Sequence, residues 1–241
     1  MRKINLIFKL SLLLCVFGVF HSCSDPEQDF QEPLLEEVLN QRSIDYLALG
    51  DSYTVGESVD YDESFPAQLS SRVENDYAFK VNTTVIAQTG WRTDELLSAV
   101  DRRENTTYAF VTLLIGVNNQ FQARPFSQYE SDFELLLKKA IRFADDDPNR
   151  VVVLSIPDYA FTPFGDRNGS PEISIEIDHY NSYAKTVSRN QGAQFLTITD
   201  ITRDGLTDPE LVAVDGLHPS GKAYAKFVER LYPLIRSRLK D

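Results

Sequence analysis

Cysteine is almost absent from this sequence. The chain has two cysteines, Cys15 and Cys23, and both lie within the first 23 residues. The rest of the chain therefore has no disulfide framework and no cysteine-based metal site. With 241 residues, 42% of them apolar, the chain is long enough to bury a core that needs no covalent staples. We expect one domain of roughly 200 residues after an N-terminal extension.

Basic residues are scarce as well. Lysine and arginine number 24 against 36 aspartates and glutamates, which gives a formal net charge of −12. Cleavage before Cys23 would remove Arg2, Lys3 and Lys9 but no acidic residue, leaving 21 basic against 36 acidic residues and a net charge of −15. Without a basic stripe, long-range repulsion opposes binding to phosphate backbones and to anionic lipid surfaces. We expect no nucleic-acid partner.

Only one long hydrophobic run is present, and it lies near the N-terminus. It extends over 11 residues from Leu10 to Phe20, after three basic residues. This length is too short for a membrane span but suits the core of an export signal. The sequence Phe20-His21-Ser22-Cys23 resembles a bacterial lipobox, although Phe20 and His21 replace the usual leucine and small residue. We expect residues 1–22 to be a signal peptide and Cys23 to be lipidated; ordinary cleavage and an uncleaved anchor are the alternatives.

The stretch 23–43 is polar and acidic and contains Pro26 and Pro33. Such a composition predicts a solvated tether ahead of a domain at 44–241. Together with the signal, it predicts an exported protein of the bacterial cell envelope, in the periplasm or on the outer-membrane surface. The N-terminal lipid would be its only contact with a membrane.

From residue 44 onward, apolar strand-like runs alternate with helical patterns. The runs are continuous rather than alternating, which is typical of parallel strands covered on both faces. We expect strands at 44–49, 79–86, 108–115, 151–156 and 194–198, and helices at about 63–74, 93–103, 127–144, 173–190 and 219–239. Five such units predict an α/β fold, a three-layer α/β/α sandwich with a five-stranded parallel sheet.

In open parallel sheets the ligand crevice lies beyond the carboxyl ends of the strands, so the loops that follow the strands should hold the chemistry. The first of these loops presents Ser52 in Gly50-Asp51-Ser52, a turn in which glycine permits a sharp bend. Any such turn favours Gly, Asp and Ser, so this tripeptide alone also fits a purely structural turn.

Beyond the signal region there are two histidines. His179 lies in a polar helical stretch and is most simply a surface residue. His218 follows Asp215 by three residues in Asp-Gly-Leu-His-Pro, just before the last expected helix. A carboxylate at that distance can orient the imidazole, although a helix-capping turn would have the same composition.

Taken together, these segments resemble the SGNH, or GDSL-type, serine hydrolase family, which has four short blocks in this order on a flavodoxin-like sandwich. Gly50-Asp51-Ser52 matches the nucleophile block, Gly90 the second block, Gly116-Val117-Asn118 the third, and Asp215 with His218 the fourth. The resemblance covers roughly residue 44 to the C-terminus. It departs from the family at Asn119, where the third block usually has aspartate, and at Tyr53-Thr54, where the first block usually continues Leu-Ser.

The resemblance implies acyl transfer to water through an acyl-enzyme. Ser52 would be the nucleophile, His218 the base and Asp215 the acid that orients it. The backbone N–H groups of Ser52 and Gly90 and the side-chain amide of Asn118 would form the oxyanion hole. No cofactor is implied, and no spacing of His, Cys and carboxylates suggests a metal.

The expected substrate is a small-molecule or saccharide ester, with short acyl groups such as acetyl preferred. A lipase, lysophospholipase or thioesterase on the same fold is the first alternative, and a non-catalytic surface-binding lipoprotein is the second. The polar and aromatic loops favour an alcohol rich in hydroxyls, and no long apolar lid segment lies between the blocks. The residues expected to line the substrate pocket are Trp91, Asn119, Asp158 and Tyr159.

Overall fold

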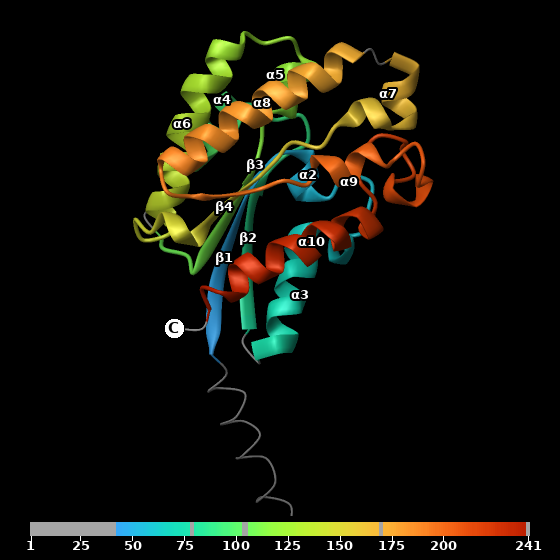
Figure 1. Cartoon of the computed structure of the whole chain (residues 1–241). Coiled ribbons are helices and arrows are strands. Elements are labelled where there is room, and N and C mark those ends of the chain that lie inside the picture. Colours follow the sequence, from blue (N-terminus) through green and yellow to red (C-terminus); the bar gives the residue numbers. More distant parts are fainter. Residues whose placement is uncertain (1–41, 78–79, 103–105, 169–170, 240–241) are drawn as a thin grey trace, which may run out of the picture. The chain divides into compact units, whose positions relative to one another are not determined.

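Five parallel strands form a single sheet at the centre of the domain in the computed structural model (Figure 1). In chain order they are β1 (Ser43–Gly50), β2 (Lys80–Ala87), β3 (Phe110–Leu114), β4 (Val151–Leu154) and β5 (Gln194–Leu196). They lie in the order β2-β1-β3-β4-β5, and every pairing is parallel. This is the flavodoxin-like order, so the predicted fold class is confirmed.

The structure describes residues 42–77, 80–102, 106–168 and 171–239. The predicted signal peptide, the lipidation site Cys23 and nearly all of the predicted tether lie outside these residues. β1 begins at Ser43, one residue before the predicted start of the domain, because Ser43 already pairs with Lys80 of β2.

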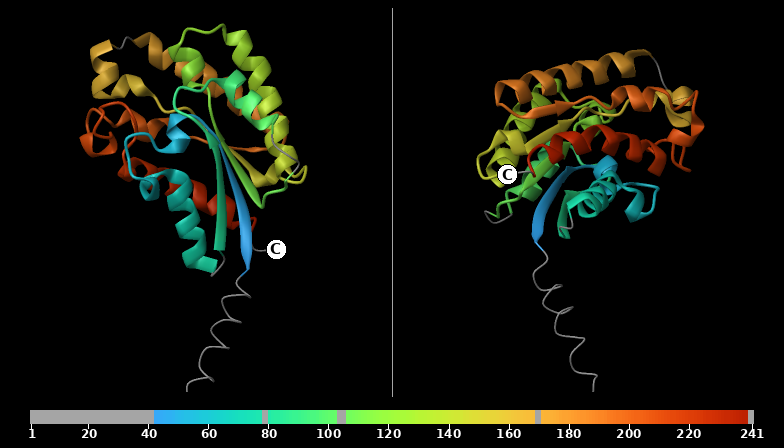
Figure 2. Two further views of the ribbon diagram at one scale, coloured as in Figure 1. Left: turned by 180° about the vertical axis from the view of Figure 1, so that it is seen from behind. Right: turned by 60° about the horizontal axis from the view of Figure 1, so that its bottom comes forward.

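Helices cover both faces of the sheet (Figure 2). α3 (Phe65–Tyr77) and α10 (Gly221–Arg236) pack against each other on one face. α4 (Thr93–Val100), α6 (Phe126–Phe143) and α8 (Pro171–Asn190) form the layer on the other face, where α6 contacts both neighbours. The expected three layers are therefore present, because each amphipathic helix buries its apolar stripe against the sheet.

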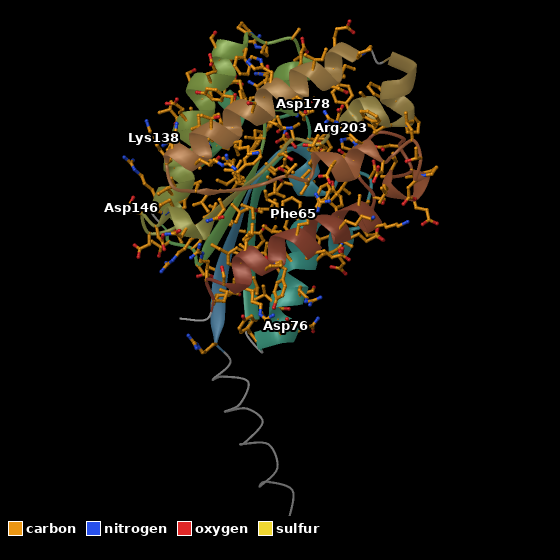
Figure 3. All side chains as sticks on the ribbon, in the orientation of Figure 1. Phe65, Asp76, Lys138, Asp146, Asp178 and Arg203 are labelled. Atoms are coloured by element: carbon orange, nitrogen blue, oxygen red, sulfur yellow. The ribbon has the colours of Figure 1, made fainter. Side chains whose placement is uncertain are left out.

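The middle of the sheet is the most deeply buried part of the core. β3 and β4 are buried along their whole length, whereas the edge strands β2 and β5 are partly exposed. A hydrogen bond of 2.7 Å joins the hydroxyls of Tyr46 and Thr112 on neighbouring strands, so these buried polar groups satisfy each other. Phe65 lies inside the molecule, whereas Lys138 and Asp178 point outward (Figure 3).

Short helices follow four of the five strands, and only the one after β4 is preceded by a 3₁₀ turn, η3 (Tyr159–Phe161). They are α2 (Ser52–Val55) after β1, α5 (Val117–Phe121) after β3, α7 (Pro163–Asn168) after β4 and α9 (Thr199–Arg203) after β5. Single 3₁₀ turns complete the described elements: η1 (Tyr61–Glu63), η2 (Pro148–Arg150), η3 (Tyr159–Phe161) and η4 (Pro209–Leu211). In the described part of the chain, no helix is long and apolar enough to cross a membrane.

Candidate active site

The predicted nucleophile lies at the carboxyl end of β1. Ser52 is the first residue of α2, and its side chain is buried apart from a small accessible fraction of 5%. The turn requires glycine at position 50, because a Cβ atom there would lie 2.0 Å from Thr54 Oγ1 and 2.5 Å from the carbonyl oxygen of Leu114. Strand β3 therefore passes close to the turn that presents the hydroxyl.

Asp51 caps the helix that Ser52 begins. Its Oδ1 atom accepts a hydrogen bond of 3.1 Å from the backbone N–H of Tyr53. The side chain is completely buried, and its Oδ2 atom has no partner among the described residues. Burial raises the pKa of Asp51 to about 7, and the hydrogen bond from Tyr53 opposes this only in part. A carboxyl group that gains a proton near neutral pH thus lies directly before the nucleophile.

Asp215 and His218 form one tight turn. His218 Nδ1 donates to Asp215 Oδ2 over 2.6 Å, while the backbone N–H groups of Leu217 and His218 both donate to Asp215 Oδ1. A fourth hydrogen bond, of 2.8 Å, comes from Ser58 Oγ. Burial alone would raise the pKa of Asp215, but these hydrogen bonds outweigh it and lower the pKa to about 2. The carboxylate is therefore ionised at every pH at which the protein would work.

The imidazole of His218 also contacts an aromatic ring. The ring of Tyr53, one residue after the predicted nucleophile, meets the ring of His218 edge to face with a centroid distance of 5.7 Å. This contact ties the turn that carries His218 to helix α2, which carries Ser52.

Gly90 lies in the turn that follows β2. The backbone N–H of Trp91 donates to the carbonyl oxygen of Gln88, and Gly90 has a φ of +84°. Positive φ at the third position of such a turn is the type II geometry, which favours glycine. Asn118 approaches from α5, and its Nδ2 atom donates to the carbonyl oxygen of Trp91 over 2.9 Å.

These residues surround one cavity of about 160 Å³. Its lining includes Ser52, Gly90, Asn118 and His218, while Asp215 lies behind His218. The other lining residues are mostly apolar: Tyr53, Thr89, Val117, Phe121, Tyr159 and Leu217. A hydroxyl, an imidazole with its carboxylate and an amide thus share one small, largely apolar space. That set of groups can perform acyl transfer.

The model of the GDSL-like Lipase/Acylhydrolase family matches residues 48–226, well over half of the chain. The chain belongs to this family. The match includes the turn of Ser52 and the turn of Asp215 and His218, and it confirms the expected class of enzyme, a serine hydrolase of ester bonds. No curated protein matches the chain.

Several solved structures have a similar fold. TesA has a TM-score of 0.63 and 16% identity, over 80% of this chain and 99% of that chain. The psychrotrophic esterase EstA from Pseudoalteromonas sp. has a TM-score of 0.59 and 17% identity, over 82% and 99%. An acetylxylan esterase from Geobacillus stearothermophilus has a TM-score of 0.63 and 15% identity, over 81% and 95%. At such identities the likeness establishes the shared fold.

Two of the residues expected in the substrate pocket of this GDSL enzyme have other roles. Asn119 is fully buried, and its amide exchanges hydrogen bonds with Thr93: Oδ1 accepts from the backbone N–H, and Nδ2 donates to Oγ1. Asp158 is also fully buried and forms an ion pair of 2.9 Å with Arg203. Neither residue lines the cavity beside Ser52, because each side chain is occupied by internal partners.

The other two expected pocket residues differ from each other. Tyr159 does line the cavity, and its hydroxyl donates to Gln120 Oε1 over 2.9 Å. Trp91 is not among the lining residues, because its side chain packs partly buried against the core. Phe121 takes part in the wall instead, with its ring 5.8 Å from that of Tyr159 and 6.2 Å from that of Phe164.

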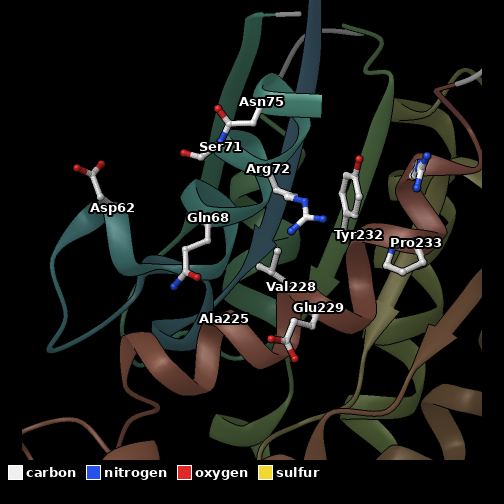
Figure 4. A pocket seen from close by; sticks show the side chains of 11 residues that line it. Asp62, Gln68, Ser71, Arg72, Asn75, Ala225, Val228, Glu229, Tyr232 and Pro233 are labelled. Carbon is white, nitrogen blue, oxygen red and sulfur yellow. The ribbon is translucent and has the colours of Figure 1, made fainter. Parts of the chain in front are cut away.

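A larger hollow lies away from these residues, between α3 and α10 (Figure 4). Its volume is about 610 Å³, and polar side chains such as Gln68, Arg72 and Glu229 line it. None of the predicted site residues reaches it, so size alone does not mark the active site of this fold. Among the described residues, no group of three or more His, Cys, Asp or Glu side chains is arranged to hold a metal ion.

Proposed function

We propose that this GDSL enzyme is an exported serine esterase that removes short acyl groups, acetyl in particular, from a saccharide or a similar alcohol. The observation that carries the proposal is the size of the cavity beside Ser52, about 160 Å³. A water molecule occupies about 30 Å³ in the liquid, so this space holds roughly five groups of that size. An acetyl group fits inside this space, whereas a sixteen-carbon chain would have to extend out of it.

The alcohol part of the substrate would lie at the mouth of the cavity. Phe121, whose exposed fraction is 53%, offers aromatic surface there, and Gln120 adds a polar group bonded to the buried Tyr159. Apolar faces with a few placed polar groups are typical of small-ligand sites. The likeness to an acetylxylan esterase agrees with a sugar alcohol at this position.

The reaction would proceed in two steps. In the first, His218 takes the proton of Ser52 Oγ, which attacks the ester carbonyl; the N–H groups of Ser52 and Gly90 and the amide of Asn118 stabilise the oxyanion. The tetrahedral intermediate then releases the alcohol, which receives its proton from His218. In the second step water attacks the acyl-enzyme with the same proton transfers, releasing the acid and restoring Ser52. Asp215, ionised throughout, holds the Nδ1–H tautomer.

The test compares kcat/KM for 4-nitrophenyl acetate, butyrate and palmitate, followed by acetate release from acetylated oligosaccharides. We expect acetate to be the best of the three esters, and acetate to be released from the sugars. A preference for palmitate, or no release from any acetylated sugar, would move the assignment to a lipase or thioesterase.

The same experiment includes variants that separate catalysis from binding. Ser52→Ala and His218→Ala should both lose turnover, and Ser52→Ala should also lose labelling by a fluorophosphonate probe. Labelling that persists in Ser52→Ala would disprove the assignment of the nucleophile, because another residue would then react with the probe.

Export and anchoring are a separate part of the proposal. It is supported by the 11-residue apolar run and by Ser22-Cys23 at its end. Mass spectrometry of the mature N-terminus should find lipid on Cys23, with Cys23→Ala as the control. An unmodified, freely soluble wild-type product would exclude the anchor.

A further inference from the structure

The turn that carries Gly90 is held from one side by two amide side chains. Gln122 Nε2 donates to the carbonyl oxygen of Gly90 over 3.1 Å, and Asn118 Nδ2 donates to the carbonyl oxygen of Trp91 over 2.9 Å. Asn118 belongs to α5, and Gln122 is the residue that caps the carboxyl end of this helix. Residues four apart lie on the same face of a helix, so both amides reach the turn together.

The amide of Gln122 is itself fixed in orientation. Its Oε1 atom accepts a hydrogen bond of 2.7 Å from Arg92 Nη1, so its Nε2 atom faces Gly90. Arg92 is in turn held by Asp94, to which its Nε and Nη2 atoms donate over 3.0 Å each. The Arg92 guanidinium thus links the start of α4, through Asp94, to the end of α5, through Gln122. Gln122 extends this link to the turn of Gly90.

On the side where a Cβ atom would lie, packing does not hold Gly90 in place. A Cβ atom at this position would have no neighbour within 4 Å, so the residue lies beside open space. Glycine also has the widest backbone freedom of all residues. Hydrogen bonds to the peptide groups of the turn must therefore fix its conformation, and an oxyanion donor contributes most when its position is fixed before the reaction.

We propose that Gln122 is a positioning residue of the oxyanion hole: it holds the carbonyl of Gly90, and thereby aims the Gly90 N–H at the substrate oxyanion. This inference rests on the proposed esterase function. Gln122 does not line the cavity itself and acts through Gly90.

The test replaces Gln122 in two ways and measures hydrolysis of 4-nitrophenyl acetate by the full chain. Gln122→Ala removes both hydrogen bonds, and we expect kcat to fall roughly 5- to 10-fold, the rate equivalent of one ordinary hydrogen bond. Gln122→Glu keeps a partner for Arg92 but places a carboxylate oxygen against the Gly90 carbonyl. We expect this variant to lose roughly 100-fold in kcat, as for a misplaced reacting group.

Two further readouts distinguish positioning from general structural support. A donor that acts mainly on the transition state affects kcat and leaves KM within about threefold. The midpoint of thermal unfolding of Gln122→Glu should stay close to that of the wild type. Gln128→Glu is the matched control, because Gln128 also accepts a hydrogen bond from an arginine, Arg124, but belongs to α6; its kcat should not change.

The outcomes separate this inference from the proposed function. Wild-type hydrolysis together with a kcat of Gln122→Glu within twofold of the wild type refutes the positioning role alone. An equal loss in Gln128→Glu refutes it too, because the effect would then be one of surface charge. A wild type that neither hydrolyses the ester nor reacts with a fluorophosphonate refutes the esterase function and this inference with it.

Discussion

Replacing Asp51 by asparagine should stabilise the protein at alkaline pH and lose this effect below about pH 4. Asp51 is completely buried, and one of its carboxylate oxygens has no partner among the described residues. Its pKa is raised from 3.8 to about 7 by burial, so the folded state binds the proton more tightly than the unfolded state does. Between these two values the wild type therefore loses stability as the pH rises.

The size of the effect follows from the two pKa values. The difference between pKa values of 3.8 and about 7 corresponds to a destabilisation of the folded wild type by about 4 kcal/mol. This destabilisation is present in full above about pH 8 and is reduced to about 1 kcal/mol near pH 4.5. Asparagine caps a helix as well as aspartate does and carries no charge. The unfolding free energy of the variant minus that of the wild type should therefore rise by about 3 kcal/mol from pH 4.5 to pH 8. This change does not depend on the part of the difference that is the same at every pH. Urea unfolding at both pH values measures it.

Asp147→Asn is the control, because Asp147 also accepts a hydrogen bond from a backbone N–H, that of Asn149. Burial alone would raise the pKa of Asp147, but its hydrogen bonds and Arg150 outweigh this and lower it. The stability that this carboxylate contributes is lost only as the pH falls below the unfolded pKa of 3.8, so the difference for Asp147→Asn should stay nearly constant between pH 4.5 and pH 8. A difference for Asp51→Asn that does not change between pH 4.5 and pH 8 would show that Asp51 is ionised in the folded protein at both, and would refute the reasoning.

Three further predictions concern catalysis. Asn118→Ala should fold normally yet lose about 10²- to 10³-fold in kcat, the usual effect of removing one oxyanion donor. A loss below about fivefold would mean that Asn118 only supports the turn through its hydrogen bond and does not stabilise the oxyanion. Asp215→Asn should reduce kcat far more than Asp158→Asn, because Asp215 contacts His218 whereas Asp158 pairs with Arg203; the opposite ranking would mean that the acid is misassigned. Phe121→Ala should lower kcat/KM for an acetylated oligosaccharide more than for 4-nitrophenyl acetate, because Phe121 offers exposed aromatic surface where the sugar would lie; an equal loss for both esters would place the sugar elsewhere.

The layers of the fold were predictable from the sequence because the strands are buried on both faces. Val151–Leu154 is a continuous apolar run, and a strand is the short element that such a run forms between polar segments. The short helices were harder to predict. α5 has five residues, fewer than two helical turns, so no periodic pattern distinguishes it from the loop that was expected there.

The active-site residues were predictable only where they belong to a sequence motif. Ser52, Gly90, Asn118 and His218 were placed by their blocks, and the structure brings them to one cavity. The pocket was predicted less well, because a residue beside a motif can turn inward. Asn119 does so to bond Thr93.

The roles of Ser58 and Gln122 were not predicted. Each bonds a site residue far away in the sequence, Ser58 to Asp215 and Gln122 to Gly90, and no local pattern encodes such a contact. A polar side chain near a motif is the only signal that the sequence offers for residues of this kind.

The turn of Asp215 and His218 has a consequence for how such enzymes diversify. Acid and base are three residues apart, and three of the four hydrogen bonds to the carboxylate arise inside the turn itself. Their mutual geometry is therefore set by the local chain, within the eight-residue segment from Ala213 to Ser220. This segment can be transferred as a unit. For proton transfer, recombination between relatives must preserve the long-range alignment between this segment and Ser52; the oxyanion hole also requires Gly90 and Asn118 to stay aligned with Ser52. Loops that shape the substrate cavity without contacting this turn can be exchanged without disturbing the proton-transfer pair, whereas the loop of Ser58, which bonds Asp215, cannot.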